Sequence, residues 1–345
     1  MTTKPNILLI YTGGTIGMVK DYKTNALKAF DFSQIVNKIP ELQQLNCKIE
    51  SISFDAPIDS SNMNTNYYLT IAEIIEDNYN AYDGFVVLTG SDTMSFTASA
   101  ISFMLENLQK PVIFTGSQLP IGDLRTDAKE NLITSIEIAC AYKNGSPIIK
   151  EVGLYFEYKL YRANRTTKIS SEQFEAFASL NFPPLAESGV HLKFNEHLVH
   201  HPKNDNKKLI VRKKLVTDVV ILKLFPGISI EVVASILAIS NLKGVILETY
   251  GSGNAPNAKP FINLLKAAID KGIKIVNVTQ CKSGSVLMGH YDTSLLLKEI
   301  GIINGLDITT ESAIAKLMYL LNEPLSLEDF TYFFEKPLRG EMTLK

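Results

Sequence analysis

The sequence lacks the features that mark several large classes of protein. Its three cysteines, Cys47, Cys140 and Cys281, are odd in number, far apart and in no C-x-x-C pair, so neither a disulfide framework nor a zinc site is predicted. No apolar run approaches the roughly 20 residues of a membrane-spanning helix. The apolar run near the N-terminus is too short for the core of a signal peptide. We therefore expect a cytoplasmic protein with no membrane partner.

The chain also has little net charge. Its formal charge is −2, whereas a nucleic-acid-binding surface normally appears as a strongly basic patch or domain. No G-x-x-x-x-G-K-[ST] motif is present, and no G-x-G-x-x-G motif follows the first apolar run, so a bound nucleotide is not expected. We predict no nucleic-acid partner and favour a small neutral or zwitterionic ligand.

The sequence does contain short apolar runs that alternate with amphipathic segments. The runs predicted as strands are NILLIY (6–11), FVVL (85–88), PVIFT (111–115), VGLYFEY (152–158), VVILKLF (219–225), GVILETY (244–250) and GIKIVNVT (272–279). Between the second and third runs, residues 93–108 have apolar side chains at helical spacing, which predicts a β-α-β unit. The pattern favours an α/β protein with parallel sheets covered by helices.

A polar stretch without clear periodicity divides the chain. We predict a linker at 191–212 between an N-terminal α/β domain at 1–190 and a C-terminal α/β domain at 213–345. Four of the five histidines lie in this stretch: His191, His197, His200 and His201. Their irregular spacing favours a solvated linker over a metal site, so no metal is predicted.

Three of the predicted strands end in Thr-Gly followed by small polar residues. These segments are YTGGTIG (11–17), LTGSDTM (88–94) and FTGSQLP (114–120). Ligands bind at the carboxyl ends of parallel strands, so we expect the three loops to line one pocket. Glycine allows close approach of the backbone, and hydroxyls and amides supply hydrogen bonds. For one loop alone, an ordinary turn before a helix, with Ser91 or Asp92 as the cap, stays open.

A hydroxyl nucleophile and a base can also be proposed from the sequence. Thr15 lies in the first loop, and a threonine hydroxyl needs a nearby base to attack an acyl group. Lys168, in LYRANRTTKIS (160–170), could serve, although most lysines are solvated surface residues and spacing alone leaves both interpretations open.

The ordered set of motifs YTGGTIGM, DSSNM, TGSDTM, TGSQLP, NRTTK, FPGIS, YGSGNAP and VTQCKSG resembles the asparaginase family, in its bacterial cytoplasmic type I branch. The resemblance extends over nearly the whole chain. It implies an N-terminal domain of flavodoxin-like topology, a smaller C-terminal α/β domain, and a homodimer or homotetramer. The implied reaction is hydrolysis of L-asparagine to L-aspartate and ammonia without a metal or cofactor.

The resemblance also implies roles for individual residues. Thr15 matches the first catalytic threonine, on a loop that closes over substrate, and Ser91 takes the place of the second. Asp92 and Lys168 match the residues that support the second hydroxyl. The implied mechanism is double displacement through Thr15, and direct attack by water held by Ser91 and Lys168 stays open.

Substrate binding is implied for a second set of residues. Asp59, Ser60 and Ser61 match the loop that holds the α-carboxylate of the substrate, and Ser91 and Asp92 complete the set, with Asp92 facing the substrate ammonium.

The chain departs from the family pattern at three places. Serine at position 91 lacks the methyl group that restricts χ1 of threonine. The lid tyrosine is unassigned, because an ungapped match puts Asn25 there and Tyr22 lies three residues earlier. A candidate effector site at Thr167, Glu248 and Cys281 has Glu248 in place of the family's arginine.

Two other functions stay open at this point. A non-catalytic amino-acid sensor would keep the binding residues and vary at the nucleophiles, as Ser91 does. A subunit of a tRNA-dependent amidotransferase would need an additional N-terminal domain, which we do not expect because the first predicted strand begins at residue 6.

Overall fold

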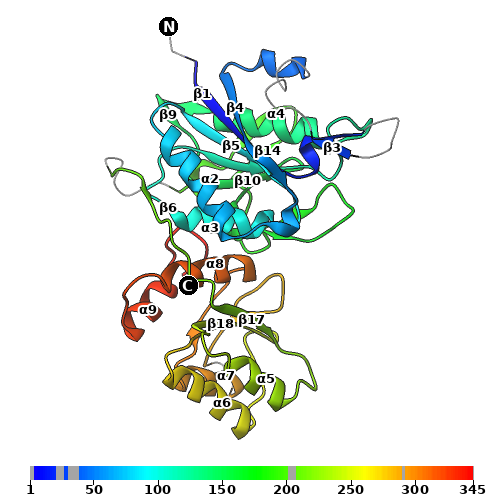
Figure 1. Ribbon diagram of the computed structural model, residues 1–345. Coiled ribbons are helices and arrows are strands. Elements are labelled where there is room, and N and C mark those ends of the chain that lie inside the picture. Colours follow the sequence, from blue (N-terminus) through cyan, green and yellow to red (C-terminus); the bar gives the residue numbers. More distant parts are fainter. Residues whose placement is uncertain (1–3, 21–26, 30–38, 201–206, 290–291, 345) are drawn as a thin grey trace. The chain divides into compact units, whose positions relative to one another are not determined.

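The computed structural model describes residues 4–20, 27–29, 39–200, 207–289 and 292–344 (Figure 1). The chain forms two compact units, Met1–Lys213 and Lys214–Lys345, and each contains its own sheet with a parallel core. The prediction of an α/β fold with a larger N-terminal and a smaller C-terminal part is confirmed.

An eight-stranded sheet forms the centre of the first unit, in the order β15-β14-β11-β10-β7-β5-β1-β4. Its parallel strands are β1 (Asn6–Gly13), β4 (Lys48–Ile58), β5 (Gly84–Leu88), β7 (Val112–Thr115) and β10 (Val152–Phe156). Numbered along the chain, these five strands have the spatial order 2-1-3-4-5. This is the flavodoxin-like order, so the predicted topology is confirmed.

Antiparallel strands extend the sheet beyond β10. They are β11 (Lys159–Arg162), β14 (Ala186–Ser188) and β15 (Leu192–Phe194). The predicted strand 152–158 ends at Phe156 because Glu157 and Tyr158 form the β10–β11 turn, with φ of 41° and 69°. Strand β15 lies inside the stretch predicted as a linker, 191–212, so this part of the stretch belongs to the sheet.

Helices cover both faces of the large sheet. They are α2 (Thr65–Asn78), α3 (Met94–Met104), which corresponds to the predicted helix 93–108, and α4 (Ala128–Ala139). α2 and α3 pack together on one face and α4 covers the other (Figure 1), where Ile7 and Leu9 of β1 share a core cluster with Leu132. Strands β5, β7 and β10 step in one direction, yet α3 and α4 connect them on opposite faces. One of these two crossovers is therefore left-handed, which is rare.

Short two-stranded pairs complete the first unit. They are β2 (Met18–Lys20) with β3 (Leu27–Ala29), β6 (Leu105–Glu106) with β16 (Ile210–Val211), β8 (Tyr142–Lys143) with β9 (Ser146–Pro147), and β12 (Thr167–Lys168) with β13 (Phe177–Ala178). The β6–β16 pair ties the end of the predicted linker to the segment that follows α3. The boundary of the unit accordingly falls after Lys213.

The second unit has a four-stranded parallel sheet in the order β17-β18-β19-β20. Its strands are β17 (Val219–Lys223), β18 (Gly244–Thr249), β19 (Lys274–Thr279) and β20 (Ile303–Asn304). Its helices are α5 (Ile230–Leu237), α6 (Lys259–Asp270), α7 (Asp292–Glu299), α8 (Thr310–Leu320) and α9 (Leu327–Phe334). Side chains of α5 and α6, among them Val233 and Leu265, form one core cluster with β17 and β18.

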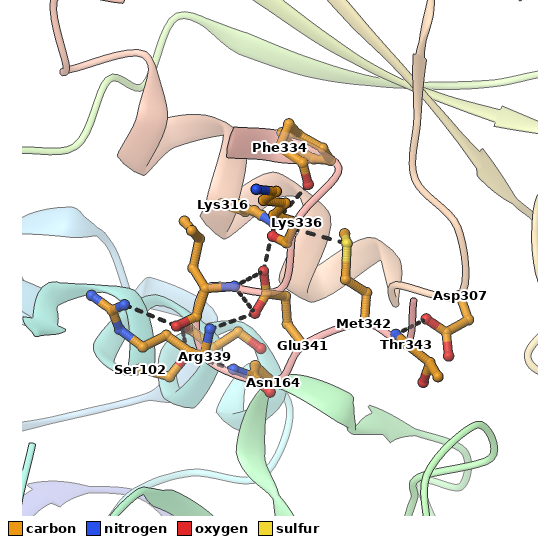
Figure 2. Close-up of polar contacts among 12 residues, drawn as sticks. Ser102, Asn164, Asp307, Lys316, Phe334, Lys336, Arg339, Glu341, Met342 and Thr343 are labelled. Carbon is orange, nitrogen blue, oxygen red and sulfur yellow. Dashed lines mark hydrogen bonds and ion pairs between the residues drawn. The ribbon is translucent and has the colours of Figure 1, made fainter. Parts of the chain in front are cut away.

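A buried ion pair anchors the segment after α9 to α8 (Figure 2). The Lys316 ammonium donates to Glu341 Oε1 at 2.5 Å, to Phe334 O at 2.7 Å and to Lys336 O at 2.6 Å. Both charged side chains are 0% exposed. Each of the three ammonium hydrogens therefore has an oxygen acceptor, which is what a buried charge requires.

Candidate active site

The three Thr-Gly loops lie at the carboxyl edge of the large sheet. They follow the neighbouring strands β1, β5 and β7, and the strand order switches direction between β1 and β5. The buried Thr12 hydroxyl donates to Leu88 O at 3.2 Å, and the buried Thr115 hydroxyl donates to Tyr155 O at 2.9 Å. These threonines stabilise the sheet edge, and the residues after them form the candidate site.

Glycines let the loops approach one another closely. A methyl group on Gly14 would lie 2.4 Å from Gly90 N, and Gly14 has a φ of 86°, which disfavours other residues. A methyl group on Gly90 would lie 2.6 Å from Ser60 Oγ. The loops after β1, β4 and β5 are therefore close enough to contact one small ligand.

A cavity of about 230 Å³ opens between these loops. Its lining residues are Gly14, Thr15, Met18, Asp59, Ser60, Gly90, Ser91, Asp92, Gln118, Lys168 and Ser171. Most of these side chains are polar, and pockets for drug-sized ligands usually measure about 300–1,000 Å³. The cavity is therefore suited to a smaller, polar ligand.

Lys168 reaches the loop after β5 from a distant part of the chain. Its ammonium donates to Ser91 Oγ at 2.8 Å and to Asp92 Oδ1 at 2.6 Å. The Lys168 side chain is 17% exposed, whereas the Asp92 side chain is 70% exposed. The lysine is thus largely enclosed, while the carboxylate stays open to a positively charged group of a ligand.

The partners of Ser91 and Asp92 differ from those of helix caps. Thr93 occupies the N-cap of α3, and its hydroxyl donates to Ser60 O at 2.9 Å. Ser91 and Asp92 are instead bonded to Lys168 and line the cavity. The structure therefore favours the site interpretation of this loop over the helix-cap interpretation.

Thr15 starts the 3-10 turn η1 (Thr15–Gly17) directly after Gly14 and lines the same cavity, partly exposed. The structure thus brings four predicted catalytic residues to one place: Thr15, Ser91, Asp92 and Lys168.

The predicted carboxylate-binding loop contributes two of its three residues. Asp59 and Ser60 line the cavity, but Ser61 N and Ser61 Oγ both donate to Asp59 Oδ1 at 2.8 Å. The hydrogen bond from Ser61 N has the larger effect and the one from Ser61 Oγ the smaller. Both hold the pKa of Asp59 below its ordinary value. Because both donors of Ser61 are used within the loop, Ser60 is the better placed to donate to a ligand.

Gln118 lines the cavity but was not singled out as a site residue in the sequence. Ser91 Oγ donates to Gln118 Oε1 at 3.2 Å, and Gln118 Nε2 donates to Gln173 O at 3.1 Å. The Gln118 backbone amide donates to Asp127 Oδ2 at 2.9 Å. Burial raises the pKa of Asp127, although these amide hydrogen bonds act against the shift.

A signal for Gln118 is present in the sequence. The segments TGSD (89–92) and TGSQ (115–118) follow neighbouring strands, and aligning them puts Gln118 at the position of Asp92. Ser171, the other lining residue that was missed, belongs to an exposed turn with no motif of its own.

The candidate effector residues belong to both units. Thr167 is buried beside Lys168 in the first unit, whereas Glu248 and Cys281 belong to the second. Glu248 Oε1 accepts the hydroxyl of Thr310 at 2.5 Å, and Cys281 is exposed. An effector role for these residues stays a prediction.

Some predictions concern residues outside the described ranges. Tyr22 and Asn25, the candidates for the lid position, and His201 in the predicted linker are among them. Within the described ranges, no group of three or more His, Cys, Asp or Glu side chains could hold a metal ion. No helix in the described part of the chain is long and apolar enough to span a membrane.

Comparison with known proteins shows the family. The family described as "Asparaginase, N-terminal" matches residues 6–200, and "Glutaminase/Asparaginase C-terminal domain" matches residues 218–334. The chain is 42% identical over 342 residues to L-asparaginase 1 of Escherichia coli, covering 99% of this chain and 98% of that protein. It is 39% identical over 366 residues to the 60 kDa lysophospholipase of Mus musculus, covering 100% of this chain and 64% of that protein.

A crystal structure of L-asparaginase I from Vibrio cholerae is similar to this structure over its full length. The TM-score is 0.89 at 39% sequence identity, and the match covers 99% of this chain and 100% of that one. Both family domains are matched in order, and the similar proteins extend over nearly all of the chain. The chain therefore belongs to the asparaginase family.

Proposed function

We propose that this protein hydrolyses the side-chain amide of L-asparagine, giving L-aspartate and ammonia. The observation that carries the proposal is the contact of Lys168 with Ser91 and Asp92 in the polar cavity that Thr15 also lines. The similarity to the L-asparaginase 1 of Escherichia coli supports it.

The charges around the cavity suit a free amino acid. Asp92, open to solvent and already bonded to Lys168, can accept a further hydrogen bond from the substrate ammonium. Ser60 and the backbone amides of the loops at Gly14 and Gly90 can donate to the substrate carboxylate and to an oxyanion.

The favoured mechanism has two displacements. The Thr15 hydroxyl attacks the amide carbon and loses its proton, the nitrogen gains a proton, and the carbon–nitrogen bond breaks to release ammonia. Water then attacks the Thr15 ester, which frees aspartate and restores the hydroxyl. The group formed by Lys168, Ser91 and Asp92 supports the proton transfers.

Direct attack by water uses the same residues and forms no ester. The two routes differ in the covalent state of the enzyme during turnover. Acid quenching followed by mass spectrometry of the peptide that contains Thr15 detects an aspartyl adduct in the double displacement. An adduct on another residue, or near-normal turnover by Thr15→Val, would exclude Thr15 as the nucleophile.

A non-catalytic amino-acid sensor is the competing function. Ammonia release from L-asparagine by the purified protein, measured against Thr15→Val, separates the two functions. Sustained release that the substitution abolishes is the expected result. Stoichiometric binding of asparagine without ammonia release would instead establish a sensor. Light scattering on the same sample tests the predicted homodimer or homotetramer.

A further inference from the structure

The Ser91 hydroxyl lies between a donor and an acceptor. Lys168, as an ammonium, can only donate, and it donates to Ser91 Oγ at 2.8 Å. On the other side, Ser91 Oγ lies 3.2 Å from Gln118 Oε1, which can only accept. The Ser91 proton therefore points toward Gln118, and one lone pair of the hydroxyl stays available to a molecule in the cavity.

The orientation of the Gln118 amide follows from its other partner. Gln118 Nε2 is 3.1 Å from the carbonyl oxygen of Gln173, which is an acceptor only. Exchanging the amide oxygen and nitrogen would place two acceptors together there, so the oxygen must face Ser91. The backbone of Gln118 is also fixed, because its amide donates to Asp127. Gln118 thus presents a rigid acceptor to Ser91.

We propose that Gln118 is a positioning residue for Ser91, and that its amide oxygen holds the Ser91 hydroxyl in the rotamer that a threonine would hold with its methyl group. A threonine is restricted at χ1 by its two heavy atoms on Cβ, whereas a serine has three accessible rotamers. The inference rests on the proposed hydrolysis, in which the Ser91 hydroxyl takes part.

A double-mutant cycle tests this role. Gln118→Met removes the acceptor at similar volume, and we expect it to lower kcat about tenfold with a smaller change in KM, which is the size of one lost hydrogen bond. In the Ser91→Thr background the same substitution should lower kcat by less than about threefold, because the methyl group then restricts the rotamer. A mainly structural role would give equal losses in both backgrounds.

Matched controls separate the possible failures. Gln43→Met makes the same exchange at an exposed position of η3 (Pro40–Gln44), away from the cavity, and should leave kcat unchanged. Melting curves report whether each variant folds, and Gln118→Ala replaces Gln118→Met in the cycle if the latter does not.

Each outcome has one meaning. Equal loss of kcat in the two backgrounds, or no loss in either, overturns the positioning role while the wild-type protein still releases ammonia. A wild-type protein that releases no ammonia overturns the proposed function. Rescue by Ser91→Thr supports both.

Discussion

The two units each contain an enclosed lysine paired with a carboxylate, but the pairs differ in their access to solvent. Lys168 Nζ lies 2.6 Å from Asp92 Oδ1. The Asp92 side chain is 70% exposed, and both residues border the cavity. Lys316 lies 2.5 Å from Glu341, and both side chains are 0% exposed (Figure 2). The first pair has room for a ligand beside it, and the second has none.

The partners of the two ammonium groups explain the difference. Lys316 donates to one carboxylate and two backbone carbonyl oxygens, which are fixed by the fold. Lys168 donates to a hydroxyl and a carboxylate, and both of these groups border the cavity. The partners of Lys168 thus leave it accessible to a ligand, whereas the partners of Lys316 are enclosed with it.

The largest expected effect is on catalysis in the first unit. Lys168→Met should lower kcat by a factor of about a thousand or more, because the loss of one member of a coupled catalytic group removes most of the rate enhancement of the whole group. The free energy of unfolding should change little, since Asp92 stays solvated without the lysine. Steady-state ammonia release and melting curves measure the two quantities. A kcat within tenfold of wild type would refute the catalytic role of this pair.

The opposite pattern is expected in the second unit. Lys316→Met leaves Glu341 buried without its counter-charge and should lower the free energy of unfolding by about 3–5 kcal/mol. Chemical denaturation measures this change. The double variant Lys316→Met, Glu341→Gln removes both charges and should be less destabilised than the single variant. If the single variant were as stable as wild type, the pair would not anchor this segment.

The buried carboxylate of Glu157 extends the comparison to a group whose pKa is raised by burial. Burial has the largest effect on the Glu157 carboxyl group, and the negative charges of Asp127, Glu130 and Glu175 add to it. Together they raise the pKa of Glu157 to about 7. The folded protein then binds this proton more tightly than the unfolded chain does, so stability falls as pH rises from the ordinary glutamate range toward 7.

Glu157→Gln should remove this loss of stability. The variant should melt about 2–4 °C above wild type at pH 8 and within a degree or so of it at pH 5. Differential scanning calorimetry at both pH values decides the matter. The same shift at both pH values would show that ionisation of Glu157 is not the cause.

A smaller effect is expected for Ser91→Thr. The substitution introduces the threonine that the resemblance implies, at a position hydrogen-bonded to Lys168 and Gln118, so kcat should rise or fall by no more than about threefold. Loss of most activity would mean that the cavity has adapted to serine and that the match of the second hydroxyl is wrong.

The dependence of rate on asparagine should be hyperbolic, or the candidate effector site should select a ligand other than asparagine. At the candidate effector site the resemblance implies an arginine that pairs with the α-carboxylate of a second asparagine, and Glu248 stands in its place. Two carboxylates at about 4 Å repel by roughly 4 kcal/mol at an effective dielectric constant near 20. Its carboxylate already has partners in the second unit, Thr310 and Lys223. A steady-state titration measures the curve. Sigmoidal kinetics that Cys281→Ala abolishes would contradict this expectation.

The sequence predicts the parallel strands better than the rest of the sheets. Strands such as β5 and β7 are buried on both faces and appear as continuous apolar runs. β4 is half exposed at the edge of the sheet, so its residues alternate with polar ones and form no such run. The antiparallel strands β14 and β15 have three residues each, which is too short for a periodic pattern.

Part of the candidate site could also be predicted from the sequence. Loop motifs place Thr15, Ser91 and Asp92 at strand ends, because topology alone brings such loops together. The hydrogen bond of Ser91 to Gln118 could not be predicted in this way. The orientation of Gln118 depends on Gln173, which lies far away in the sequence. The family resemblance, and not spacing, was needed to select Lys168 among the lysines.

The backbone contact of Gly14 with Gly90 limits how this site can be redesigned. A side chain at Gly14 would meet the backbone of Gly90, whereas one at Gly90 would meet the side chain of Ser60. Most substitutions at Gly14 should therefore be inactive. Variation that accommodates a larger amide substrate must come from the side chains of the lining, of which Met18 is the most adaptable. The close approach of the backbone at Gly14 to Gly90 thus limits variation there, whereas the lining side chains of the cavity can vary.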